Sequence, residues 1–564
     1  MVRRIINIFY KEFTTINQAA ILLGIFTLLS QVLGLVRDRL LASEVGVSAS
    51  LDVYYAAFRI PDIVFALAAS LVSITILIPF FIEAKHKDSE HRGHSQKFIN
   101  SVFTAFFIGI IVLSAIIFIL MPYLAPMIAP GFDADQISSL IQLSRIMLLS
   151  PIFLGFSNLF GTITQSARKF FVYATAPILY NAGIVIGIIA LYPIFGIHGL
   201  VYGVIIGAIL HMAIQIPVII RQGYIPRLTS QIHWKYIGRI TALSLPRTFT
   251  LSINKILIAV FIALASKISD GAVSIFNFAW NLQNVPLALI GMSFSVAAFP
   301  TLVQYFADND RENFLKQIIA PARQIIFWSL PVIVFFIVLR AHIVRVILGA
   351  GYFSWTDTRL TAAALALFVL SIMFQGLILL LVRGYYAAGQ TWRPLWITVV
   401  GASVSMASAF GFLHLFETYP VLANAVESML RVQGVPGTSV LMLALAYTCG
   451  EAIRFIIMYF WFRREYMRGY APGLARVFLE SLIGSLVMGF SIYHLLQIFN
   501  QYFDINTFTG VFMQGFLSGS IGIILAVLTL VALGNQELRA IYHALSKKGI
   551  LKSPPVDTGK EDVM

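Results

Sequence analysis

Long apolar stretches recur from one end of the chain to the other, and short polar segments separate them. A helix of about 20 apolar residues is long enough to cross the hydrocarbon core of a bilayer. The pattern therefore predicts an all-α polytopic membrane protein with about fourteen transmembrane helices. The expected spans lie near residues 18–41, 52–83, 99–127, 137–166, 171–192, 197–220, 240–266, 271–306, 323–345, 359–389, 394–415, 438–462, 476–499 and 508–534.

An internal repeat appears when the chain is offset by about 221 residues. The run AAFRIPDIV (56–64) then corresponds to FAWNLQNVP (278–286), and Pro79 corresponds to Pro300. Repeats of the same sense with an even number of spans are related by an axis along the membrane normal, and such halves enclose a central cavity. We expect two pseudo-symmetric six-helix lobes around a central cavity, with two extra C-terminal helices.

The expected organisation follows from the repeat and from the basic, amphipathic N-terminus, which has no cleavage site of small residues. It comprises an interfacial N-terminal helix (1–14), an N-lobe with spans 1–6 (15–222), a cytoplasmic linker (223–238), a C-lobe with spans 7–12 (239–465), spans 13 and 14 (476–534) and a cytoplasmic tail (535–564).

Composition supports the membrane assignment, because 59% of the residues are hydrophobic, only 11% are charged and the mean hydropathy is +0.86. The net charge of +14 raises the possibility of a nucleic-acid partner. With the N-terminus placed in the cytoplasm, and residues at span ends counted with the adjoining loops, 26 of the 39 Lys and Arg fall in cytoplasmic segments, five in outer loops and eight in spans. This distribution follows the positive-inside rule, so we expect both termini inside, a location in the cytoplasmic membrane and no nucleic-acid partner.

Basic residues inside the spans are the most informative feature of the sequence. A cation at the bilayer centre costs roughly 2.5–3.5 kcal/mol even on lenient insertion scales, so such residues rarely face lipid. We expect Arg39 to reach the outer interface and Arg454 to pair with Glu451. Several of the cations, with neighbouring Asp and Asn, fall on repeating helical faces and indicate a polar cavity for an anionic passenger. The eight basic residues are Arg37, Arg39, Arg59, Arg145, Arg247, Lys255, Arg383 and Arg454.

Span 2 carries a polar stripe on one helical face, because its members are three or four residues apart. The stripe consists of Asp52, Tyr55, Arg59 and Asp62, and its repeat partners on span 8 are Ser274, Asn277, Asn281 and Asn284. An ion pair between Arg59 and Asp62, one turn apart, is the simpler interpretation. Two stripes in register across the repeat favour a shared cavity wall, which we prefer.

The first helix of each lobe adds further polar residues. In span 1, Ser30 and Arg37 share a face, while Asp38 points aside and is placed to tether a neighbouring helix. In span 7, Arg247 precedes Lys255 by about two turns, and Pro246 is expected to loosen the helix beside them.

Enzyme signatures are absent from the sequence, which has no Walker loop and no HExxH motif. The lone cysteine, Cys449, excludes an intramolecular disulfide, and we expect no metal and no cofactor. We therefore expect a transporter and not an enzyme. Arg and Lys among Asn, Ser and Tyr suit a phosphate or diphosphate passenger, because the guanidinium fork binds phosphate oxygens in pairs.

The run SQVLGLVRDRLLASEVGVSASLDVYYAAFRIPD (30–62) resembles the MurJ/MviN family of lipid II flippases, within the multidrug/oligosaccharidyl-lipid/polysaccharide exporter superfamily. LPRTFTLSINKI (245–256) and the 271–302 run extend the resemblance. It implies fourteen spans, a groove for an undecaprenyl tail on spans 13 and 14, and export of the lipid-linked peptidoglycan precursor, lipid II, by alternating access. Cell-wall synthesis proteins are further expected partners, besides membrane lipids.

Three departures from the family pattern concern its cations: Gln31 follows the serine of span 1, Phe65 stands at one position of an arginine pair, and Asn281 replaces an arginine on span 8. The expected substrate-binding residues are accordingly Arg37, Arg59, Arg247, Lys255, Asp52, Asn277, Asn281 and Ser30. The expected structural or gating residues are Asp38, Asp62 and Pro246.

Three alternatives remain open at this stage. The departures permit a flippase for another undecaprenyl-diphosphate-linked oligosaccharide. An ion-coupled multidrug exporter is less favoured, because sites for cationic drugs usually carry acidic residues whereas this cavity has an excess of cations. A scaffold that recruits wall-synthesis enzymes through its basic loops would need none of the cavity cations.

Overall fold

The computed structural model describes residues 16–540 except 69–71, 73, 88–92 and 469–472. The side chains of 16–21, 74–76, 86–87, 243, 246 and 247 are likewise outside the description. The expected interfacial helix at 1–14 and most of the expected tail therefore lie outside the described residues. The described part is helical, without strands.

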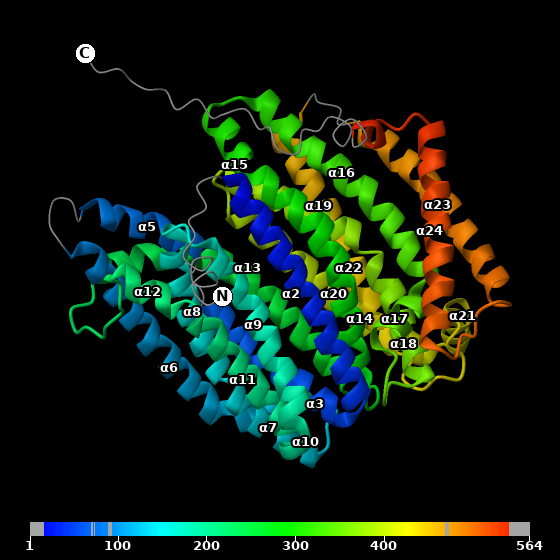
Figure 1. The fold of residues 1–564 in the computed structure, drawn as a ribbon, viewed down its shortest axis with the longest axis horizontal. Helices are drawn as coiled ribbons and strands as arrows, with labels where there is room; N and C mark the ends of the chain where they lie inside the picture. The colour runs from blue at the N-terminus through cyan, green and yellow to red at the C-terminus, as the bar shows by residue number, and fades with distance from the viewer. Residues whose placement is uncertain (1–15, 69–71, 73, 88–92, 469–472, 541–564) are drawn as a thin grey trace, which may run out of the picture.

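The N-lobe, on the left of Figure 1, begins with α2 and ends with α12. Its helices are α2 (Ile16–Glu44), α3 (Ala49–Ala57), α4 (Arg59–Ala68), α5 (Ile74–Lys87), α6 (His94–Ile128), α7 (Ala134–Met147), α8 (Leu149–Ser166), α9 (Phe170–Ile186), the π-helix η1 (Gly187–Leu191), α10 (Tyr192–Phe195), α11 (Ile197–Ala213) and α12 (Ile216–Gln222).

The C-lobe lies beside it, with the last two helices at its far edge (Figure 1). Its helices are α13 (Trp234–Ala265), α14 (Ala272–Leu287), the π-helix η2 (Ala288–Met292), α15 (Ser293–Ala307), α16 (Arg311–Val338), α17 (Arg340–Leu348), α18 (Trp355–Val369), α19 (Ile372–Ala387), α20 (Trp392–Thr418), α21 (Pro420–Leu430) and α22 (Val440–Tyr466). The chain then continues into α23 (Leu474–Phe499) and α24 (Phe508–Ala532), which pack on each other and on α16 and α17.

Among the described residues, eleven helices are long and apolar enough to cross a membrane, or twelve if the α18–α19 pair, bent by 42°, forms one span. The expected number of fourteen is therefore not confirmed. The two expected spans that do not qualify are the first two. The described side chains of α2, residues 22–44, include four charged ones at its end, Arg37, Asp38, Arg39 and Glu44. The second span is divided into α3, α4 and α5, none longer than 14 residues.

The sequence repeat is visible in the helix ends. Asp133 before α7 and Ser354 before α18 each form a capping box, and these two positions correspond in the repeat. Both capped helices break after about four turns and continue as α8 and α19, whose C-caps, Ala167 and Ala388, correspond at the same offset. The two lobes thus fold with the same local signals, in the register that the sequence predicts.

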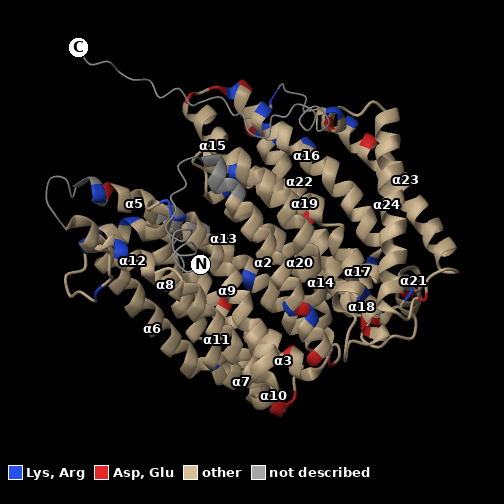
Figure 2. Ribbon diagram, viewed as in Figure 1, with Lys and Arg blue, Asp and Glu red and all other residues tan. Residues whose placement is uncertain are grey.

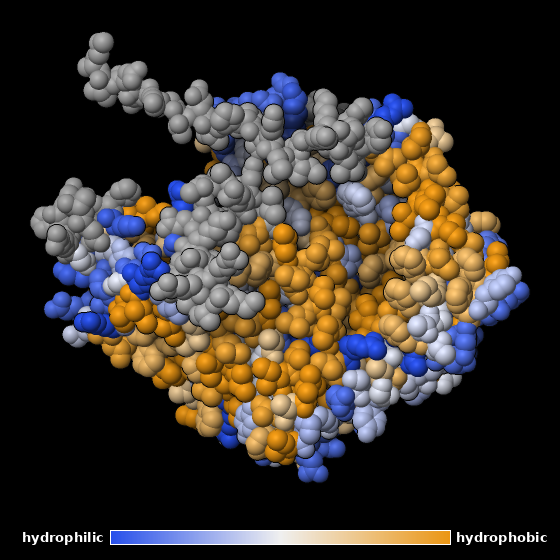
Figure 3. All heavy atoms as spheres, in the orientation of Figure 1, coloured by the Kyte–Doolittle hydropathy of each residue, from blue (hydrophilic) through white to orange (hydrophobic). Residues whose placement is uncertain are grey.

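The surface separates into an apolar belt and two polar ends. Figure 3 shows the belt over the middle of the visible face. Apolar side chains of the spans are well exposed, for example Ile119 on α6 and Phe490 on α23, each 69% exposed. Lys and Arg gather at the end that carries α5, α12 and the start of α16 (Figure 2). An apolar surface of this extent on so many helices is what contact with lipid requires.

Helix α13 belongs to the C-lobe by sequence, but its first half packs on the N-lobe. The guanidinium carbon of Arg239 lies 5.3 Å from the ring centre of Phe80 on α5, and the rings of Tyr236 and Phe98 on α6 are 6.0 Å apart. The linker before α13 is also fixed on α6, since Asn100 accepts a 2.9 Å hydrogen bond from the Arg227 amide. Residues 234–238, expected in the linker, are helical.

Candidate functional site

The two lobes meet through the polar residues of α3 and α4 on one side and of α14 on the other. Asp52, which is 1% exposed, accepts hydrogen bonds from the Gly271 amide (2.7 Å) and from the Ser274 amide (2.7 Å) and hydroxyl (2.5 Å). Gly271 is the N-cap of α14, so this carboxylate lies at the positive end of the α14 dipole. A residue of one lobe therefore caps a helix of the other.

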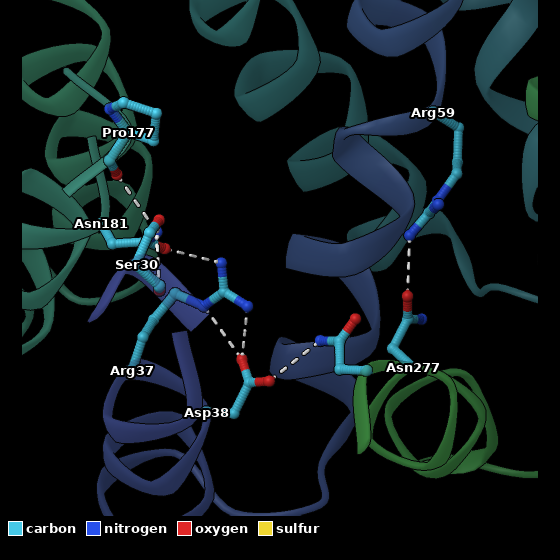
Figure 4. Close-up of polar contacts among 8 residues, drawn as sticks. Ser30, Arg37, Asp38, Arg59, Pro177, Asn181 and Asn277 are labelled. Atoms are coloured by element: carbon cyan, nitrogen blue, oxygen red, sulfur yellow. Dashed lines mark hydrogen bonds and ion pairs between the residues drawn. The ribbon is translucent and has the colours of Figure 1, made fainter. Parts of the chain in front are cut away.

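A second contact joins the lobes seven residues after Asp52 on one stripe and three residues after Ser274 on the other. Arg59 donates from Nη2 to the Asn277 side-chain oxygen at 2.8 Å (Figure 4). Its Nε donates to the Tyr55 carbonyl at 3.1 Å. The side-chain amide of Asn277 donates to the Val273 carbonyl at 2.8 Å. This bond leaves the side-chain oxygen of Asn277 facing Arg59. The stripes on spans 2 and 8 thus face one another.

Asp62 pairs with Lys255 of α13 at 2.9 Å, and not with Arg59. The simpler interpretation, an internal Arg59–Asp62 pair, is therefore wrong: each side chain bonds across the lobe boundary instead. Both members of the Lys255–Asp62 pair keep contact with solvent-accessible space, with 45% and 34% of their side chains exposed. An exposed pair of this kind contributes little to stability.

A third contact lies between α2, α9 and α14 (Figure 4). Arg37 donates to Asp38 from Nε (2.9 Å) and Nη2 (2.7 Å), and from Nη1 to the Asn181 oxygen at 3.2 Å. The other Asp38 oxygen accepts from Asn281 at 3.0 Å. Asn181 also donates to the Ser30 hydroxyl at 3.3 Å, so one network holds Ser30, Arg37, Asp38 and Asn281 together.

These contacts leave the charges unequally balanced. Asp38 neutralises Arg37 and Asp62 neutralises Lys255, whereas the hydrogen bonds of Arg59 go to a neutral amide and a backbone carbonyl. Within the described part of the cluster, Arg59 is the cation without a carboxylate bonded to it. A half-buried guanidinium in that situation favours an anionic ligand.

The predicted residues divide by accessibility. Asp38, Asp52 and Asn277 are buried, so they hold the lobes and are not exposed to a ligand. Partly exposed side chains belong to Ser30, Arg37, Arg59, Asp62, Lys255 and Asn281. Arg247 and Pro246 are on α13, but their side chains lie outside the described residues.

The other basic residues of the spans lie elsewhere. Arg454 bonds to Glu451 at 3.2 Å, as expected, and also to the Thr398 hydroxyl at 3.0 Å. Arg145 donates to the Phe118 carbonyl at 3.1 Å, and Arg383 donates to the Ser295 hydroxyl at 3.2 Å. Backbone carbonyls and hydroxyls thus serve as partners that the sequence did not identify.

Arg39, which was expected to reach the outer membrane interface, also contacts α17 and α24. It donates from Nη1 to the carbonyls of Val346 (2.7 Å) and Ile347 (3.2 Å) near the end of α17, and its guanidinium carbon lies 5.5 Å from the ring centre of Phe508 on α24. The adjacent Ser43 carbonyl accepts from the Tyr352 amide at 3.0 Å. The end of α2 is therefore fixed to the C-lobe and to α24.

We expect Arg39→Gln to lower the stability of the purified protein by about 2 kcal/mol, because hydrogen bonds of a charged donor contribute about 1.5–3 kcal/mol. The loss should appear as a lower midpoint of thermal unfolding in detergent. Arg227→Gln, at an exposed linker residue, is the matched control. An unchanged midpoint for Arg39→Gln would show that these bonds do not stabilise the lobe contact.

Asn181 is the member of the cluster that the sequence analysis missed. It lies on α9, a helix otherwise rich in apolar residues, and links Arg37 to Ser30. An amide in the middle of an apolar span was the available signal, because buried polar side chains in membranes need partners.

Known proteins resemble this chain in sequence over most of its length. A family model described as lipid II flippase MurJ matches residues 41–513. The lipid II flippase MurJ of Burkholderia cenocepacia is 23% identical over 473 residues, which cover 82% of this chain and 87% of that protein. The probable lipid II flippase MurJ of Haemophilus influenzae is 23% identical over 541 residues, covering 92% of this chain and 100% of the relative.

Solved structures show the same fold. One described as lipid II flippase MurJ in an inward closed conformation superposes with a TM-score of 0.71 at 22% identity, covering 93% of this chain and 100% of that one. An inward-facing multidrug-resistance MATE transporter of the MOP superfamily gives a TM-score of 0.60 at 15% identity, covering 80% of this chain and 98% of that one.

Proposed function

The chain belongs to the MurJ family of lipid II flippases, and on that premise we propose that it carries lipid II from the inner to the outer leaflet of the bacterial cytoplasmic membrane by alternating access. The observation that carries the proposal is the polar cluster between two apolar lobes. It offers cations to a diphosphate at a place where an unaided diphosphate could not pass, because burying its charges in hydrocarbon is prohibitively costly.

Arg59 is the first candidate for the diphosphate, since it has neutral partners and lies where the stripes of the two lobes meet. Arg37 is the second, because its side chain is 23% exposed although Asp38 neutralises it. Arg247 precedes Lys255 by about two turns on α13 and would complete the set. Guanidinium groups suit this role, because each binds two phosphate oxygens and stays charged at any physiological pH.

The orientation follows from the distribution of charge. We assign the end with α5, α12 and the start of α16 to the cytoplasm, because Lys and Arg gather there (Figure 2). The contacts at Asp52, Arg39 and Ser43 then lie at the outer end. In this orientation the lobes are closed toward the outside, and the passenger would enter from the inner leaflet.

The undecaprenyl tail needs an apolar path beside the headgroup. Helices α23 and α24 pack on α16 and α17 at the edge of the C-lobe, and Figure 3 shows a hollow with an apolar surface beside them. We propose that the tail stays in this hollow, in contact with lipid, while only the headgroup crosses between the lobes. The hydrocarbon chain then never leaves an apolar environment.

A second passenger remains worth testing, another undecaprenyl-diphosphate-linked oligosaccharide. Asn281 bonds to Asp38 at a position where the family often has arginine, so the headgroup meets an amide there in place of a cation. The diphosphate contacts proposed above would serve either passenger, and the sugar contacts would differ.

The decisive experiment is transport of defined lipid II by the purified full-length protein in proteoliposomes. We expect lipid II to become accessible on the opposite leaflet faster than in protein-free vesicles. An undecaprenyl-diphosphate oligosaccharide without the peptide tests the second passenger in parallel. Transport of that glycan and not of lipid II would favour the alternative, and transport of neither would contradict both.

A further inference from the structure

An apolar cavity of about 470 Å³ lies between the C-lobe helices α16, α19 and α22 and helix α23. Figure 1 shows these four helices in the upper half of the view. Side chains that line it include Ile326, Leu381, Phe455 and Phe478, one from each helix. Among the described lining residues, Tyr459 contributes the one polar side-chain group, its hydroxyl. A water-filled state is disfavoured, because a buried water needs two to four polar partners.

The cavity is separate from the polar cluster between the lobes. None of its lining residues belongs to α2, α4, α13 or α14, the helices that carry the cations and their partners. The cavity and the polar cluster therefore have no lining helix in common.

The position of the cavity identifies where a headgroup would lie. Met467, just past the end of α22, and Leu474, at the start of α23, both line it, so it extends to the end of these helices. That end carries the exposed side chains of Arg463, Arg464 and Arg468. A single lipid could thus have its chain among apolar residues and its headgroup beside arginines.

The charge at this end is not neutralised by the acids nearby. Glu465 is bonded to Arg393, and Glu480 is bonded to Arg476 at 2.6 Å. Arg468 donates from Nε to the Arg464 carbonyl at 2.8 Å. Within the described part of the chain, no carboxylate bonds to Arg464 or to Arg468. The rim of the cavity therefore has an excess of positive charge.

We propose that this cavity binds one acyl chain of an anionic phospholipid, whose phosphate contacts Arg464 and Arg468. The volume is roughly sixteen times the 30 Å³ that one water molecule takes in the liquid. If each carbon of an acyl chain needs about that space, the cavity suits a single fatty-acyl chain. Basic residues between helices at the cytoplasmic face select anionic headgroups over zwitterionic ones. The occupant is a bulk membrane lipid and not the transported substrate.

The test is lipid retention by the purified full-length protein. After delipidation in detergent it is titrated with dioleoyl-phosphatidylglycerol or with dioleoyl-phosphatidylcholine, and bound copies are counted by native mass spectrometry. We expect about one tightly held phosphatidylglycerol, and weaker retention of phosphatidylcholine. Equal retention of the two lipids, or retention of neither, would overturn the proposal.

Variants locate the site. Leu381→Trp fills the cavity from α19 and should abolish the tight copy, and Ala322→Leu narrows it from α16 if the first variant fails to fold. Leu486→Trp, at a 57% exposed residue of α23 outside the cavity, is the matched control and should retain the lipid. Retention by both filled variants would place the lipid elsewhere.

The charge contribution is measured with Arg464→Gln and Arg468→Gln. Each should weaken phosphatidylglycerol binding by roughly fivefold, the effect of one basic residue near an anionic headgroup, and leave phosphatidylcholine unaffected. Lys235→Gln, exposed at the start of α13, is the control. Lipid II transport is scored separately in the same preparations, so that loss of transport with retained lipid counts against the proposed function alone.

Discussion

Replacing Arg59 by glutamine is expected to abolish, or to reduce at least roughly tenfold, the transport of lipid II in proteoliposomes, because a hydrogen bond to a charged group contributes about 1.5–3 kcal/mol. Glutamine retains a donor for the Asn277 oxygen that Arg59 now contacts at 2.8 Å, so the lobe contact has a substitute. What is lost is the cation that, among the described residues of the cluster, has no carboxylate bonded to it. The protein should still insert and purify normally.

The comparison with Lys255→Gln makes this prediction specific. Lys255 is already neutralised by Asp62 and is 45% exposed, so its loss should reduce transport much less. Lys235→Gln, away from the cluster, controls for a general effect of removing charge. If Arg59→Gln and Lys255→Gln impaired transport equally, the charge balance described here would not determine where the diphosphate binds.

A second large effect is expected for Asp52→Asn, which should shift the protein toward states in which the lobes separate at this end. The carboxylate accepts three hydrogen bonds at the start of α14 and lies at the positive end of that helix dipole. Removing its charge should change the ratio of closed to open states by roughly tenfold or more, since charge-assisted bonds are about twice as strong as neutral ones.

The shift can be measured by crosslinking, because Cys449 is the single cysteine of the chain. In a Cys449→Ser background, cysteines at Ser43 and Tyr352, whose backbones are hydrogen-bonded at 3.0 Å, should form a disulfide readily when the lobes are closed. Asp52→Asn should slow its formation. Ser274→Ala, which removes one of the three bonds, should have a smaller effect, and an unchanged rate in Asp52→Asn would show that other contacts keep the lobes closed.

The sequence predicted the fold well, because the signals of membrane helices are local. Runs of apolar residues predict the membrane-spanning helices from His94 to Ala532, and the offset of the sequence repeat recurs in capping boxes and helix ends. The division of the second span into α3, α4 and α5 was not predicted, since its apolar pattern continues across the breaks. Helix α21, in an expected outer loop, was also missed.

The sequence predicted residues that belong to the site, but not which of them bond to one another. Helical spacing placed Asp52, Arg59 and Asp62 on one face, but it gives no information about which residue of the other lobe each one meets. Arg59 therefore had its neighbour Asp62 as the obvious partner, whereas the structure gives it Asn277 and gives Asp62 to Lys255. Contacts between lobes depend on how two surfaces dock, and no local pattern encodes that.

The hydrogen bond between Asp52 and Ser274 joins two positions that are equivalent in the repeat. Such a contact lies close to the pseudo-twofold axis, where each position faces its own counterpart. In a dimer of identical halves a carboxylate there would face a second carboxylate, and like charges at that distance repel. A closure made of an acid and a helix N-terminus therefore requires halves that have diverged at this position, and joining two diverged lobes in one chain supplies that difference in every molecule.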